Sequence, residues 1–152
     1  MKLYVLSYLV YFALIVSGCS SKENQQCSVF LDVSEPMAIT KGPYEHLFAS
    51  YYGINSWSAD QRYVTVLQTD IKYRLPTEND TAVLGLVDLQ TNEFIPITTT
   101  VAWNFQQGCM AHWLQTHPDS RIIYNDLVDE KNMSIIMDVH TGEKIKTLPY
   151  PV

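Results

Sequence analysis

The sequence predicts an all-β fold, a partial β-propeller made of about two four-stranded antiparallel blades. The first observation behind this prediction is a hairpin that recurs at an offset of fifty residues, Asp-Leu-Gln-Thr-Asn-Glu at 88–93 and Asp-Val-His-Thr-Gly-Glu at 138–143. The second is a turn led by tryptophan, which recurs at 57–62 and 113–121. A repeat of about fifty residues built from four short strands is typical of a propeller blade.

The first blade is expected at roughly 50–100, with strands near 62–69, 83–89 and 94–98. The first of these alternates between two faces, one with Tyr63, Thr65 and Leu67 and the other with Val64 and Val66. The second is a nearly continuous apolar run, as expected of a strand covered on both faces. The third contains Pro96, which favours a strand at the edge of the sheet.

The second blade is expected at 101–149, with strands in the same order at 111–115, 122–125, 133–139 and 144–148. In the recurrent hairpin, Asn92 and Gly142 occupy a position that needs a left-handed backbone, which Asn and Gly tolerate best. Residues 125–126 and 129–130 are expected to form the solvated tip of a further hairpin. Before the first blade, 27–44 is expected to be an irregular or short-strand segment, and the aromatic segment 48–54 is expected to be buried.

The stretch 102–114 is expected to form the joint between the two blades. It places two tryptophans, a phenylalanine and three side-chain amides around the single Gly108, and it contains no Lys or Glu. This mixture suits a partly buried polar cluster rather than a solvated loop. We therefore expect Trp103, Gln107 and Trp113 to pack at the joint.

Residues 1–18 have the organisation of a bacterial lipoprotein signal peptide. Lys2 precedes an apolar run at 3–16 that is too short to span a bilayer comfortably. The run ends in Val-Ser-Gly-Cys at 16–19, which resembles a lipobox and implies that the mature chain begins with a lipidated Cys19. The alternatives are an ordinary secretory signal and a short membrane anchor.

The expected domain boundaries follow from this signal. Cys19 and the polar residues up to 28 form a tether between the lipid and a domain at 29–152. Ser20 after the lipidated cysteine resembles the signal for outer-membrane sorting. The expected localisation is therefore the cell envelope, with the chain anchored through its lipid to the outer membrane and facing the periplasm or the cell surface.

Net charge and cysteine content limit the partners. A formal net charge of −6 argues against a nucleic-acid partner, because phosphate binding needs a basic face. Once Cys19 carries lipid, Cys27 and Cys109 remain. They either pair in the oxidising envelope or stay as two separate, partly buried thiols.

The segment Trp-Ser-Ala-Asp-Gln-Arg-Tyr-Val at 57–64 resembles the Trp-Ser-Pro-Asp-Gly-Arg-Tyr pattern of TolB-like, WD-repeat-like bacterial propellers. Ala59 and Gln61 stand where that pattern has Pro and Gly. The recurrent hairpin belongs to the same pattern, and the resemblance covers roughly 50–148. Complete propellers have at least four blades, so we expect the chain to be the N-terminal part of a longer protein. The alternative is a small two-sheet protein.

The favoured function is a membrane-tethered scaffold or binding module for a carbohydrate or protein ligand, without catalysis or a cofactor. A propeller offers a rigid rim with variable loops, and the loop at 70–80 suits such a rim. The residues expected to contact a ligand are Lys72, Tyr73 and Arg74 in that loop, and Trp103, Gln106, Gln107 and His112 in the joint.

The alternative function is an enzyme. The block at 103–113 is similar to one in uncharacterised secreted propellers that also resemble oligogalacturonate lyases. This similarity implies a metal-dependent polysaccharide lyase-like enzyme, incomplete in this chain, in which a cation neutralises a uronate carboxylate. Gln106, Gln107 and His112, with Glu45 and His46 from the preceding segment, would hold manganese or calcium.

Overall fold

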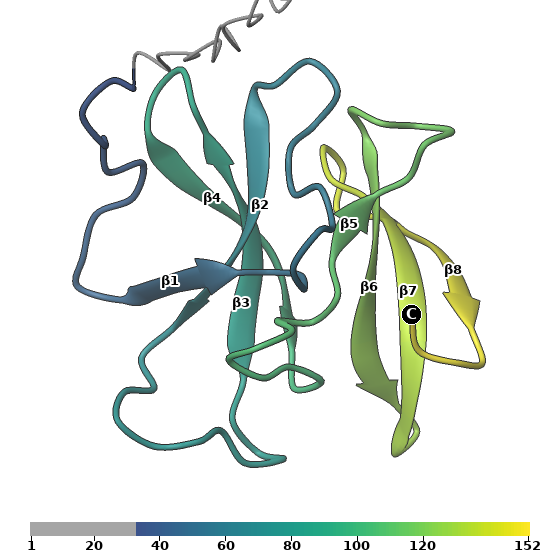
Figure 1. Cartoon of the computed structure of the whole chain (residues 1–152). Coiled ribbons are helices and arrows are strands. Elements are labelled where there is room, and N and C mark those ends of the chain that lie inside the picture. Colours follow the sequence, from purple (N-terminus) through teal and green to yellow (C-terminus); the bar gives the residue numbers. More distant parts are fainter. Residues whose placement is uncertain (1–32) are drawn as a thin grey trace, which may run out of the picture. The chain divides into compact units, whose positions relative to one another are not determined.

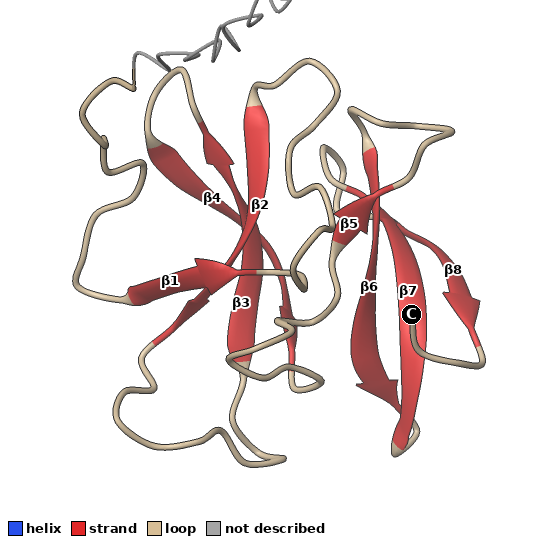
Figure 2. Cartoon of the chain, viewed as in Figure 1, coloured by secondary structure: helices blue, strands red, loops and turns tan. Residues whose placement is uncertain are grey.

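The computed structural model describes residues 33–152, and this part of the chain is all-β without a helix. Eight strands in it form two four-stranded antiparallel sheets, β1-β2-β3-β4 and β5-β6-β7-β8 (Figures 1 and 2). The strands are β1 Glu45–Phe48, β2 Tyr63–Thr69, β3 Ala82–Asp88, β4 Glu93–Thr100, β5 His112–Trp113, β6 Arg121–Val128, β7 Lys131–Asp138 and β8 Lys144–Leu148. Both sheets belong to one compact unit, Met37–Val152.

The all-β prediction is confirmed, as are the positions of the strands within a few residues. The first sheet begins with β1, ahead of the expected start near residue 50. Pro96 lies on β4, which is an edge strand as predicted. The residues expected to be signal peptide and lipidated tether, 1–28, lie outside the described residues.

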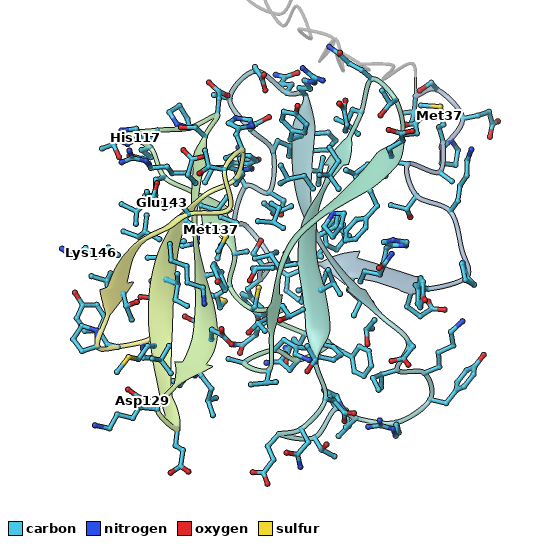
Figure 3. All side chains as sticks on the ribbon, turned by 180° about the vertical axis from the view of Figure 1, so that it is seen from behind. Met37, His117, Asp129, Met137, Glu143 and Lys146 are labelled. Carbon is cyan, nitrogen blue, oxygen red and sulfur yellow. The ribbon has the colours of Figure 1, made fainter. Side chains whose placement is uncertain are left out.

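The main hydrophobic core lies between the two sheets. Leu67, Leu84 and Leu86 from the first sheet meet residues of β6 and β7, and the latter are Ile122, Tyr124, Ile135 and Met137. A smaller cluster on the other face of the first sheet contains Val64, Val66 and Val87. The predicted division of β2 into two faces is therefore confirmed. Figure 3 shows how densely side chains fill the space between the sheets, with Met137 labelled on β7.

Two local expectations about burial were wrong. In the segment 48–54, Phe48 and Tyr52 are 77% and 78% exposed, although Ala49 and Ser50 are buried. At the β6–β7 hairpin, Asp129 and Glu130 form the tip with positive φ angles, but Asn125 is buried. The Asn125 side chain bonds the backbone N–H and C=O of Val152, so the amide is satisfied inside the fold.

The recurrent hairpin has the predicted backbone. Asn92 and Gly142 adopt φ angles of 57° and 73°. Their N–H groups donate to the carbonyls of Asp88 and Asp138, at 2.7 and 2.9 Å. The carboxylate of each aspartate also accepts a hydrogen bond from the backbone N–H of the residue two positions later. The same residue types thus build the same turn twice.

Replacing Gly142 by alanine is expected to lower the free energy of unfolding by about 1 kcal/mol, because an L-residue strains at positive φ. No atom lies within 4 Å of the site that a Cβ would occupy, so the effect comes from the backbone alone. Gly142→Asn, which copies Asn92, should cost clearly less. Chemical denaturation of both variants measures the difference, and equal costs would contradict this account of the turn.

The tryptophan turns are also equivalent. Trp57 pairs with Val64, and Trp113 pairs with Ile122. Val64 and Ile122 in turn pair with Val87 and Met137, which are fifty residues apart. The predicted correspondence of the two turns is therefore confirmed by their registers. Gln61, which stands where the resembling pattern has Gly, adopts a φ of 59°.

The joint between the sheets is built on Ala49. Its carbonyl accepts hydrogen bonds from the N–H groups of Cys109 and Ala111, at 3.1 and 2.9 Å. Next to it, the indole Nε1 of Trp113 donates to the carbonyl of Ser56 at 3.0 Å. These bonds connect the segment after β1 with the segment before β6, so the stretch 102–114 is a joint as predicted.

Candidate functional site

The loop between β2 and β3 is held by two ion pairs. Lys72 Nζ lies 2.6 Å from Glu45 Oε1 on β1. Arg74 donates two hydrogen bonds to the Asp80 carboxylate, at 2.6 and 2.8 Å, and Asp80 also accepts from the Thr77 N–H. Between the two cations, Tyr73 is fully exposed with a φ of 59°. The loop therefore exposes the ring of Tyr73 between two residues that ion pairs hold in place.

The loop at 104–108 is ordered by an asparagine. Asn104 Oδ1 accepts the N–H groups of Gln106 and Gln107, at 2.9 and 2.8 Å. Asn104 and Gly108 form an isolated bridge that closes the loop. The turn projects Phe105, which remains 38% exposed while its ring meets the buried Trp103 edge-on at 5.5 Å.

Trp103 connects these two loops. Its Nε1 donates to the backbone carbonyl of Asp80 at 2.7 Å, while the Asp80 carboxylate holds Arg74. The two loops border a cleft of about 200 Å³, which we call the rim cleft. Its lining residues are Glu45, Leu47, Ile71, Lys72, Tyr73 and Phe105. The cleft thus combines two exposed aromatic rings with one paired cation and anion.

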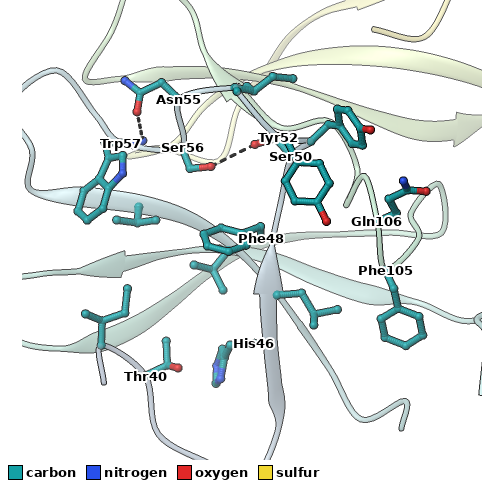
Figure 4. A pocket seen from close by; sticks show the side chains of 17 residues that line it. Thr40, His46, Phe48, Ser50, Tyr52, Asn55, Ser56, Trp57, Phe105 and Gln106 are labelled. Carbon is teal, nitrogen blue, oxygen red and sulfur yellow. Dashed lines mark hydrogen bonds between the residues drawn. The ribbon is translucent and has the colours of Figure 1, made fainter. Parts of the chain in front are cut away.

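A second and larger hollow of about 580 Å³ lies beside β1, and we call it the aromatic groove (Figure 4). Its lining contains Phe48, Tyr51, Tyr52, Trp57 and Phe105, together with His46 and the polar residues Ser50, Asn55, Ser56 and Gln106. Among residues 33–152, no Asp, Glu, Lys or Arg lines it. Two hydrogen bonds brace its wall, Trp57 N–H to Asn55 Oδ1 at 3.0 Å and Ser50 Oγ with Ser56 Oγ at 3.1 Å.

Hydrogen bonds and burial set the protonation of these groups. The Arg74 guanidinium, helped by Thr77, holds the pKa of Asp80 far below its ordinary value. The Glu45 carboxylate raises the pKa of Lys72. Burial lowers the pKa of His46 despite the opposing effect of Glu45. The rim cleft thus contains the Lys72–Glu45 ion pair, and His46 in the aromatic groove favours its neutral form.

The structure brings some of the predicted ligand residues together. Lys72 and Tyr73 line the rim cleft, and Gln106 lines the aromatic groove. Arg74 is bound to Asp80, and Trp103 is a buried structural residue. The 70–80 loop and the 104–108 loop thus both contact Asp80, and ligand contact by these residues stays a prediction.

Two predicted residues of the joint lie elsewhere. Gln107 is exposed, so its expected packing at the joint was wrong; its Oε1 accepts only a long bond from Asn104 Nδ2 at 3.4 Å. His112 is half-buried on β5, and its Nδ1 donates to the Met110 carbonyl at 3.0 Å. The Asn104 turn satisfies the local backbone groups, and this leaves the glutamine amides free to face solvent.

The residues proposed for a metal do not fit a shared site. His46 Nε2 hydrogen-bonds Gln68 across the β1–β2 pair, whereas His112 and Gln107 have the partners given above. Among residues 33–152, no group of three His, Cys, Asp or Glu side chains is placed to hold a metal ion. We therefore derive no metal-dependent step.

Cys109 carries a buried free thiol that donates to the Ala49 carbonyl, with the sulfur 3.8 Å from the oxygen. Burial raises the pKa of this thiol to about 12, so it stays protonated at neutral pH. Its suggested partner Cys27 lies outside the described residues. The thiol packs at the joint and is no nucleophile.

Sequence reasoning missed Phe48 and Phe105 as surface aromatics. Phe48 ends β1 and Phe105 sits at the tip of a turn, where neither alternation nor spacing reveals which way a ring points. Phe105 contributes its partly exposed ring to the lining of the rim cleft. The order Asn-x-Gln-Gln-Gly at 104–108 could have predicted this ring, because it is typical of an Asx-type turn that projects one residue.

Comparisons with known proteins leave the family open. No family model matches the sequence, and no curated protein and no solved structure matches it significantly.

No helix among residues 33–152 has the length and apolarity needed to cross a membrane.

Proposed function

We propose that this chain is a membrane-tethered binding module that recognises a carbohydrate at the rim cleft. The observation that supports the proposal is the convergence of the 70–80 and 104–108 loops on Asp80. Because both loops contact Asp80, Tyr73 of one loop and Phe105 of the other line the same cleft. Binding sites with exposed aromatic rings and a few placed polar groups fit ligands that have both apolar and polar faces.

The chemistry of the cleft suits a sugar. The C–H face of a pyranose stacks on an aromatic ring, and its hydroxyls pair with charged and amide groups at the margin. Lys72 and Glu45 offer a donor and an acceptor, and the exposed amides of Gln106 and Gln107 lie on the adjoining turn. Because the charges of Lys72 and Glu45 neutralise each other, the pair can hydrogen-bond sugar hydroxyls and does not require a charged ligand.

We further propose that the two sheets are blades of a TolB-like β-propeller. The equivalence of the hairpins and of the tryptophan turns supports this, since both recur with the same register. In such an arrangement the rim cleft lies in loops, where a rigid scaffold can carry a variable ligand site. Cys19 and the tether would then hold the module at the outer membrane.

Titration with a panel of neutral and acidic oligosaccharides tests the carbohydrate proposal. Tyr73→Ala is expected to weaken binding of the best ligand about tenfold, as loss of a central aromatic contact does. Because Tyr73 is fully exposed, the variant should keep the melting temperature of the original protein. Tyr150→Ala, at an exposed tyrosine outside the cleft, is the control. Absence of binding across the panel, or an unchanged affinity in Tyr73→Ala, would sink the proposal.

Replacing Cys19 by alanine is expected to abolish incorporation of labelled fatty acid and to leave the precursor uncleaved before residue 19. The reason is that the lipobox places the cysteine sulfur as the site of acylation, and anchoring needs these acyl chains. Metabolic labelling and mass spectrometry of the N-terminus measure both effects. Cys27→Ala is the matched control and should be processed normally. Persistent labelling of the Cys19 variant would refute the tether.

A further inference from the structure

Both cations of the loop between β2 and β3 already have an anionic partner. Lys72 Nζ lies 2.6 Å from Glu45 Oε1, and the Arg74 guanidinium donates to both carboxylate oxygens of Asp80. The Lys72–Glu45 pair lines the rim cleft, whereas Arg74 and Asp80 lie outside its lining. The hydrogen bond to Glu45 raises the pKa of Lys72, so the ammonium stays charged at neutral pH. A ligand in the cleft therefore meets Lys72 together with Glu45 rather than as an isolated cation.

The Lys72–Glu45 pair has hydrogen-bonding capacity left for a ligand. An ammonium carries several N–H donors, and a carboxylate offers both of its oxygens as acceptors. The contact between the two side chains occupies Oε1 of the carboxylate and one side of the ammonium. Both side chains are open to solvent, 42% exposed for Lys72 and 47% for Glu45. Neighbouring hydroxyls of a sugar ring match this arrangement, because one hydroxyl donates to the carboxylate while the next accepts from the ammonium.

A carboxylate on the ligand fits the same place poorly. It has acceptor oxygens only, so it accepts from Lys72 but faces Glu45 without a proton to donate. Like charges brought together in a binding site lower the affinity. The loop 70–80 together with Glu45 contains four acidic and two basic residues, namely Glu45, Asp70, Glu78 and Asp80 against Lys72 and Arg74. An acidic sugar therefore approaches a locally negative surface, on a chain with a formal net charge of −6.

From these contacts we infer, on the premise that the rim cleft binds carbohydrate, that Glu45 makes the cleft selective for neutral sugars with neighbouring hydroxyls over uronates and other acidic sugars. The rings of Tyr73 and Phe105 carry no formal charge, so they pack on the apolar face of either kind of sugar. Selectivity therefore comes from the Lys72–Glu45 pair. Removing the charge of Glu45 leaves Lys72 as a free cation beside the two rings, which is the arrangement that a uronate needs.

Calorimetric titration of the full chain at low salt with matched oligosaccharides tests this selectivity. Each pair is a neutral chain and its uronate counterpart, glucose against glucuronate, galactose against galacturonate and mannose against mannuronate. The original protein is expected to bind the neutral member about tenfold more tightly or better. Glu45→Gln keeps the shape of the side chain and should lower this ratio about tenfold, because Lys72 is then free to pair with the uronate. Uronate binding by the variant should also weaken as salt is added. The melting temperature should stay close to that of the original protein, because the lost ion pair is exposed.

Glu78→Gln is the matched control, because Glu78 is an exposed glutamate of the same loop that lies outside the lining of the cleft. It removes the same charge and should leave the ratio nearly unchanged. Tighter binding of the uronates by the original protein overturns the selectivity but leaves carbohydrate binding standing. So does a ratio that Glu45→Gln leaves unchanged, or that Glu78→Gln lowers equally. Absence of binding to every member of the panel overturns both the selectivity and the carbohydrate site.

Discussion

Trp113→Ala is expected to lower the free energy of unfolding by about 3–5 kcal/mol, as other large-to-small core substitutions do. The side chain is nearly fully buried in the core between the two sheets, so its removal leaves a cavity that both sheets line. The change also leaves the Ser56 carbonyl without its indole donor. Thermal and chemical denaturation followed by far-ultraviolet circular dichroism measures the loss.

Gln107→Ala is the control for this experiment, because it changes the same stretch of chain at an exposed side chain. A surface substitution of this type should change the free energy of unfolding by only about 0.5 kcal/mol. If Trp113→Ala were as mild as Gln107→Ala, the contact between the sheets would not be the main source of stability. Trp57→Ala should fall between the two, since Trp57 is already 46% exposed.

Gly108→Ala is expected to destabilise the protein by about 2–5 kcal/mol through strain and a clash together. Gly108 has a φ of 58°, and a Cβ at this position would lie 2.3 Å from the carbonyl carbon of Ala49 and 2.4 Å from its oxygen. Both atoms belong to the carbonyl whose oxygen accepts hydrogen bonds from the N–H groups of Cys109 and Ala111, so a shift of this carbonyl would disturb the joint. Equilibrium denaturation with urea measures the change.

Gly53→Ala separates the two causes. Gly53 also has a positive φ, of 82°, but no atom lies within 4 Å of its Cβ position. Its replacement should therefore cost only the backbone strain, about 1 kcal/mol. A Gly108→Ala variant no weaker than Gly53→Ala would mean that the Ala49 segment can yield, and the joint would then be looser than its hydrogen bonds indicate.

The joint explains why both large effects are expected in one short stretch. Gly108 lets the backbone of the 104–108 loop approach Ala49, and the same approach brings Cys109 and Ala111 within hydrogen-bonding distance of its carbonyl. Trp113 then fills the space beside Ser56. Loss of either the close approach or the large side chain is therefore expected to weaken the contact between the sheets.

Strands and turns were readable in the sequence because their causes are local. Alternation of apolar and polar residues placed β2, an apolar run placed β3, and Pro96 marked an edge. Asn92 and Gly142 marked two equivalent hairpins because few residues accept a positive φ. Each of these signals depends on a residue and its neighbours in the chain.

Burial was not readable in the same way. Trp57 and Trp113 begin equivalent turns with equivalent strand pairing, yet only Trp113 is covered. The stretch around Gln107 looked like a buried cluster, but the Asn104 turn satisfies the backbone there and leaves the amides in solvent. Whether a side chain is covered depends on the sheet that packs against it, and that sheet is distant in the sequence.

The rim cleft depends on tertiary structure for the same reason. Lys72 and Tyr73 were recognisable as loop residues, but the structure alone shows that Phe105 lines the same cleft, beside Trp103, which donates to the Asp80 carbonyl. Local sequence decided the side-chain period and the turn conformations of this protein, since steric and hydrogen-bonding preferences act between near neighbours. The packing of one sheet on the other decided which aromatic rings became core and which remained exposed, because burial is a property of both surfaces in contact.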